Sequence, residues 1–159
     1  MNVMNTTEKA PVLVGVDGSD SSLDALRYAA KIAAALGAPL RAITTWDYPA
    51  LIDLCPTPGW IPDEDAADIL NAAIGNVFAG DPPAELSAAV VAGPPASVLI
   101  KESRDAEMLV LGSRGRGGFT GLLLGSVSST CSTHAHCPVL IVRHERHERH
   151  DENAERTES

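Results

Sequence analysis

Five short apolar runs, separated by segments with helical periodicity, constrain the fold of this chain more than any other feature. They span residues 12–16, 40–46, 86–92, 108–111 and 139–142 and are rich in Val, Leu, Ile and Ala. Strands that are apolar on both faces are typical of the interior of a parallel sheet. Because strands and helices alternate, the pattern predicts right-handed βαβ units and an α/β fold.

The segments between these runs carry helix signals. Ser21 or Ser22 is the expected N-cap of the first helix, and Gly37 is its expected end. Pro94 and Pro95 fit the start of the third helix, where a missing N–H group costs little. The other helices are expected around 66–77 and 127–135, where apolar residues recur at helical spacing.

A glycine-rich stretch at 112–126 lies between the fourth apolar run and the fourth helical segment. Glycines let backbone N–H groups turn inward, and the start of a helix adds free N–H groups and a positive dipole end. The order strand, glycine loop, helix therefore predicts a site for the phosphates of a nucleotide. The alternative is a flexible surface connection, because glycines are also common in turns.

Asp17, Thr45, Gly93 and Gly112 follow or end predicted strands. Ligands of parallel α/β sheets bind at the carboxyl ends of strands, so these residues are expected around one crevice. For Asp17 an alternative stays open, since aspartate also organises turns that precede helices.

Composition narrows the function classes. The 159 residues suffice for one domain, and the net charge of −9 argues against nucleic-acid binding through a broad basic surface. Three cysteines without paired spacing suggest reduced thiols in the cytoplasm, and neither a signal peptide nor a membrane span is legible. We expect a flexible segment at 1–9, one domain at 10–143 and a charged disordered tail at 144–159. Whether the proline-rich loop at 47–62 acts as a lid stays open.

The glycine stretch fits neither a Walker P-loop nor a dinucleotide fingerprint, because it lacks the lysine of the first and the glycine spacing of the second. Its pattern Gly112-x2-Gly115-x9-Gly125-Ser126 instead resembles the nucleotide-binding signature of the universal stress protein family. The runs 12–17, 105–112, 125–128 and 137–142 also resemble that family's segments, in the same order. The resemblance covers about residues 10–143.

The resemblance implies a single-domain three-layer α/β sandwich, Rossmann-like and similar to adenine nucleotide alpha hydrolases. Its five-stranded parallel sheet would have the order 3-2-1-4-5. The implied nucleotide site consists of Val16, Asp17, Thr45, Gly112, Arg114, Gly115, Gly125, Ser126 and Val127. Asp17 would lie near the ribose and phosphates and help to hold Mg²⁺, Thr45 would lie beside the adenine, and Gly125 and Ser126 would receive the outer phosphates.

The implied function is that of an ATP-binding regulatory protein of the stress response. The alternatives are a binder of AMP or cyclic AMP, and a slow ATPase. The sequence shows no clear general base beside the loop and no pairing of a nucleophile with a histidine. We therefore expect no enzymatic activity beyond slow hydrolysis of ATP. The family commonly dimerises through the last strand, which makes 139–142 the expected interface. The sequence does not name a protein partner.

Overall fold

The computed structural model describes residues 8–47, 62–115 and 124–144. Most of the proline-rich loop, the middle of the glycine stretch with Arg116, and almost all of the expected N-terminal segment and tail lie outside these residues. The expectations about a lid at 47–62 and a disordered tail therefore stay predictions.

A five-stranded sheet forms the centre of the molecule, with all neighbouring strands parallel. Its order is β3-β2-β1-β4-β5, which confirms the predicted topology. The strands are β1 (Val12–Gly15), β2 (Leu40–Trp46), β3 (Leu86–Ala92), β4 (Met108–Gly112) and β5 (Val139–Val142). Val14 of β1 is in register with Ala42 of β2 and with Val110 of β4, and all three side chains are buried.

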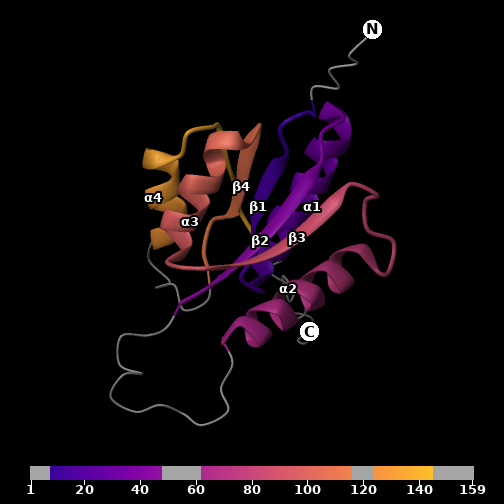
Figure 1. Cartoon of the computed structure of the whole chain (residues 1–159), viewed down its shortest axis with the longest axis horizontal. Coiled ribbons are helices and arrows are strands. Elements are labelled where there is room, and N and C mark those ends of the chain that lie inside the picture. The colour runs from indigo at the N-terminus through magenta and orange to yellow at the C-terminus, as the bar shows by residue number, and fades with distance from the viewer. Residues whose placement is uncertain (1–7, 48–61, 116–123, 145–159) are drawn as a thin grey trace, which may run out of the picture.

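Helices cover both faces of the sheet (Figure 1). They are α1 (Asp20–Leu36), α2 (Pro62–Phe78), α3 (Pro95–Glu102) and α4 (Ser126–His134), with a short 3-10 helix η1 (Ser103–Asp105) after α3. Buried residues of α1 and α2 share one apolar cluster, whereas those of α3 and α4 share another on the opposite face. None of the helices in the described part of the chain is long and apolar enough to cross a membrane.

The start of α1 differs from the prediction. Ser19, rather than Ser21 or Ser22, is the N-cap, and the Ser22 N–H donates to its Oγ at 3.2 Å. The chain turns into the helix earlier because Gly18 adopts a φ of 81°, a conformation that glycine reaches without strain. The predicted end at Gly37 is confirmed by its left-handed conformation.

Gly112, at the end of β4, packs against the main chain of α1. A Cβ atom on Gly112 would lie 2.7 Å from the carbonyl carbon of Ser21, which is closer than atoms pack. The backbone of a helix cannot rotate away as a side chain can. The missing side chain therefore sets how closely α1 approaches the sheet.

We expect Gly112→Ala to lower the free energy of unfolding by about 1–3 kcal/mol, because the added methyl group overpacks this contact. Gly75→Ala is the matched control, since Gly75 is exposed within α2 and a Cβ there meets nothing within 4 Å. The control variant should gain about 0.5–1 kcal/mol from helix propensity. Urea denaturation measures both changes, and equal stability of the two variants would contradict the packing role of Gly112.

Candidate functional site

A cavity of about 610 Å³ opens at the carboxyl ends of the central strands. The ends of β1, β2 and β4 form its floor, and the starts of α1, α3 and α4 contribute to its walls. All nine site residues expected from the sequence line this one cavity: Val16, Asp17, Thr45, Gly112, Arg114, Gly115, Gly125, Ser126 and Val127. The volume lies within the range of small-molecule sites in proteins, roughly 300–1,000 Å³.

The start of α4 forms the wall that suits an anion. Gly125 is the N-cap and provides no side-chain cap, in contrast to Ser19 of α1. The first N–H groups of a helix have no partner inside the helix, so the first turn of α4 presents donors and a positive dipole end at the cavity wall. This arrangement is chemically suited to bind phosphate oxygens.

Two hydrogen bonds fix α4 against the end of β4. The Gly125 N–H donates to the Ser113 carbonyl oxygen at 2.7 Å, which draws the two ends of the glycine stretch together. The Ser128 hydroxyl donates to the Gly112 carbonyl oxygen at 2.6 Å. The first turn of α4 is therefore held next to the strand end before any ligand binds.

The Asp17 carboxylate lines the cavity from the segment that follows β1. Its Oδ1 accepts hydrogen bonds from the Ser19 N–H at 2.9 Å and from the Ser19 hydroxyl at 2.6 Å. Its Oδ2 lies beside Gly115, where a Cβ atom would come within 2.6 Å of it. Because it has no side chain, Gly115 leaves room for the Asp17 carboxylate.

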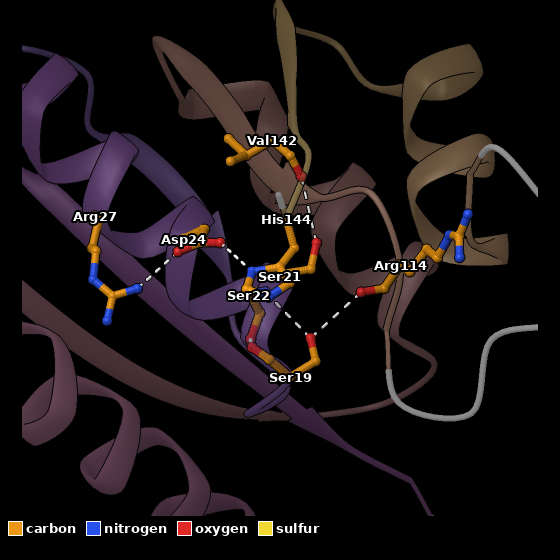
Figure 2. Close-up of polar contacts among 8 residues, drawn as sticks. All are labelled: Ser19, Ser21, Ser22, Asp24, Arg27, Arg114, Val142 and His144. Carbon is orange, nitrogen blue, oxygen red and sulfur yellow. Dashed lines mark hydrogen bonds and ion pairs between the residues drawn. The ribbon is translucent and has the colours of Figure 1, made fainter. Parts of the chain in front are cut away.

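Arg114 is exposed at the rim of the cavity. Its carbonyl oxygen lies 3.4 Å from the Ser19 hydroxyl, so the segment after β4 contacts the start of α1 (Figure 2). In that view the Arg114 side chain extends away from Ser19.

Four apolar side chains form the remaining wall, and the sequence prediction included none of them. They come from β2, α2, α3 and β4: Ile43, Ile69, Leu99 and Leu111. Beside them Thr45 lines the cavity, while the buried Thr44 donates its hydroxyl to the Val16 carbonyl oxygen at 2.8 Å. Such a wall can accept the flat face of an aromatic base. Strand periodicity could have indicated the residues from β2 and β4. It does not show which residues of the helices reach the same cavity.

Ser19 and Ser22 also line the cavity and were not expected there. The sequence signal for Ser19 was its place two residues after Asp17, where a short hydroxyl side chain bonds a neighbouring carboxylate or caps a helix. Ser22 lies in the first helical turn, and its hydroxyl donates to the Ser19 carbonyl oxygen at 2.9 Å.

The two cysteine thiols in the described part of the chain are poor nucleophiles. Burial raises the pKa of Cys131 to about 11, so its thiol stays protonated at neutral pH. Burial also raises the pKa of Cys137. Within the described residues no group of three or more His, Cys, Asp or Glu side chains could hold a metal ion.

The family model of the universal stress protein family matches residues 10–143. A universal stress protein of Mycobacterium tuberculosis strain H37Rv is 35% identical over 145 residues, which cover 89% of this chain and 48% of that protein. A universal stress protein of Mycolicibacterium smegmatis is 37% identical over 143 residues, covering 85% and 46% respectively. The chain thus spans about half the length of these curated relatives.

Solved structures share the fold over nearly their whole length. UspA of Lactobacillus plantarum has a TM-score of 0.69 at 26% identity, with 86% of this chain and 99% of that chain covered. A universal stress protein in complex with cAMP has a TM-score of 0.64 at 29% identity, with 85% and 97% covered. Sequence motifs, sheet order and the matched family model agree, and the chain belongs to the universal stress protein family.

Proposed function

We propose that the cavity binds ATP and that the protein is a nucleotide-dependent regulator of the stress response. The first turn of α4 supports this proposal most directly, because it lines the cavity and begins without a side-chain cap. Three phosphates of ATP would use its N–H donors better than a single phosphate. The free thiols of Cys131 and Cys137 fit the cytoplasmic location that we propose with it.

The two other walls match the remaining parts of an adenine nucleotide. The apolar side chains beside Thr45 suit the base, and the Asp17 carboxylate suits a ribose hydroxyl. Mg²⁺ is commonly bound by one or two carboxylates together with phosphate oxygens and water. Asp17 fits the role of the protein ligand for such an ion, which would neutralise part of the triphosphate charge.

Cyclic AMP is the second candidate. A relative with 29% identity and the same fold was solved in complex with cAMP. Cyclic AMP keeps the adenine but carries one phosphate with a single negative charge, so it would draw less on the N–H groups of α4. The two nucleotides therefore test which wall of the cavity dominates binding.

We expect ATP to bind one per chain and at least roughly tenfold more tightly than AMP, because each added hydrogen bond to a charged group stabilises a complex by about 1.5–3 kcal/mol. Isothermal titration calorimetry with ATP, AMP and cAMP, with and without Mg²⁺, measures the affinities. Tighter binding of cAMP than of ATP would select the second candidate. Absence of binding by all three would overturn the proposed function.

We expect Gly125→Val to weaken ATP binding by roughly tenfold or more. The valine side chain would lie beside the first N–H groups of α4 and would keep the phosphates away from them. A Cβ on Gly125 meets Arg114 Cα and the Gly115 nitrogen at 3.5 Å, which is ordinary van der Waals contact, so the variant should fold. Gly75→Ala, away from the cavity, serves as the control. Unchanged ATP affinity in folded Gly125→Val would contradict the assignment of α4 to the phosphates.

Binding rather than catalysis is the proposed activity, with at most slow hydrolysis of ATP. We expect phosphate release far below the roughly 1–1,000 s⁻¹ of typical enzymes, whether Mg²⁺ is present or not. A continuous phosphate-release assay measures this rate. Turnover that reached the enzymatic range and was lost in Gly125→Val would instead assign an ATPase to the cavity.

We further propose that two copies of the chain associate through β5. This strand is last in the sheet order and, among the described strands, pairs only with β4. Val139, Leu140 and Ile141 are only half-buried, so pairing with a second β5 would remove apolar surface from water. Native mass spectrometry at micromolar concentration should show a dimer, and the same spectrum reports co-purified nucleotide. A monomer alone would exclude this interface.

A further inference from the structure

The hydroxyl of Ser19 lies where three segments of the cavity wall meet. Its Oγ is 2.6 Å from Asp17 Oδ1, accepts a hydrogen bond from the Ser22 N–H at 3.2 Å, and is 3.4 Å from the Arg114 carbonyl oxygen. Figure 2 shows the last two contacts. One small side chain thus touches the segment after β1, the first turn of α1 and the segment after β4.

A hydroxyl has a single proton to donate. The 2.6 Å contact with a carboxylate oxygen is short and charge-assisted, so the proton goes to Asp17 rather than to the more distant Arg114 carbonyl. The Ser19 N–H donates to the same oxygen at 2.9 Å. Two donors from one residue thus converge on Oδ1 and fix the rotation of the carboxylate.

We propose that Ser19 is a positioning residue, which orients the Asp17 carboxylate toward the bound nucleotide. This inference rests on the proposed nucleotide binding and adds a residue that acts on affinity through Asp17. A helix cap alone would contribute to stability but not to affinity. The two roles can be separated because they use different features of the same hydroxyl, its proton for Asp17 and its oxygen lone pair for the Ser22 N–H.

Ser19→Gly removes the hydroxyl and keeps the N–H donor. Glycine is almost as favourable as serine at an N-cap, so we expect the melting temperature to fall by only about 1–2 °C. We expect the affinity for ATP to fall about tenfold, as for the loss of one hydrogen bond to a charged group. Ser19→Thr keeps the hydroxyl and should bind ATP like the wild type.

Ser21→Ala is the matched control. Ser21 lies in the same helical turn, and its hydroxyl contacts the Val142 carbonyl oxygen at 3.4 Å (Figure 2). It is not one of the residues that line the cavity. We expect unchanged ATP affinity in this variant. Equal losses in Ser19→Gly and Ser21→Ala would mean that any weakening of α1 lowers affinity, and would overturn the positioning role.

A double-mutant cycle tests whether Ser19 acts through Asp17. Calorimetry with ATP is carried out on Ser19→Gly, Asp17→Ala and the double variant. We expect Ser19→Gly to change the affinity less than about twofold once Asp17 is replaced, because no carboxylate is left to orient. The same tenfold loss in both backgrounds, or no loss in either, would overturn the inference.

Crystal structures of the wild type and Ser19→Gly without nucleotide give a second readout. We expect the Asp17 carboxylate to rotate away from its wild-type orientation in the variant, while the backbone of α1 stays in place. An unchanged carboxylate would overturn the positioning role. If the wild type bound no adenine nucleotide, the proposed function would fail, yet this comparison would still decide whether Ser19 orients Asp17.

Discussion

The cavity depends on the close packing of α1 against the end of β4. Gly112 has no side chain, and the main chain of Ser21 occupies the space that a Cβ would take. Three of the six buried residues of α1 are alanines with no more than 4% of their surface exposed, and side chains this small permit the short separation. Because α1 lies so close, its first residues reach the segment that follows β4. A side chain on Gly112 would separate the two walls of the site.

An acidic protein can still hold an anion when the contacts are local. The chain carries a net charge of −9, which disfavours anions at long range. Salt screens exposed charges beyond about 8–10 Å, whereas N–H groups at the start of a helix act within hydrogen-bond distance. The first turn of α4 lines the cavity without a side-chain cap, so its N–H groups can contact an anion despite the negative charge of the whole protein. The net charge therefore argues against a broad surface that binds a polyanion such as nucleic acid, but not against a local pocket that binds phosphate.

Helix α4 is stabilised more by its contacts with the rest of the protein than by the helix propensity of its own residues. Six of its nine residues are serine or threonine, which compete with helical hydrogen bonds in isolated peptides. Here hydroxyls bond back one turn, as from Thr130 to the Ser126 carbonyl oxygen at 2.8 Å. Burial of Cys131 and the bond from Ser128 to Gly112 hold the helix on the sheet. Because its side chains are small, α4 can pack with its first turn close to the end of β4, where that turn lines the cavity.

The amino-acid sequence by itself determined the five strands, the helices between them and the glycine stretch, because hydrophobic periodicity and glycine placement act within a few residues. The resemblance to a known family supplied the order of the sheet and the site residues that line the cavity. Two features followed only from tertiary packing: the contact of Gly112 with α1, and the apolar wall that joins Ile69 and Leu99. Each depends on the distance between elements far apart in the chain, which no local pattern encodes.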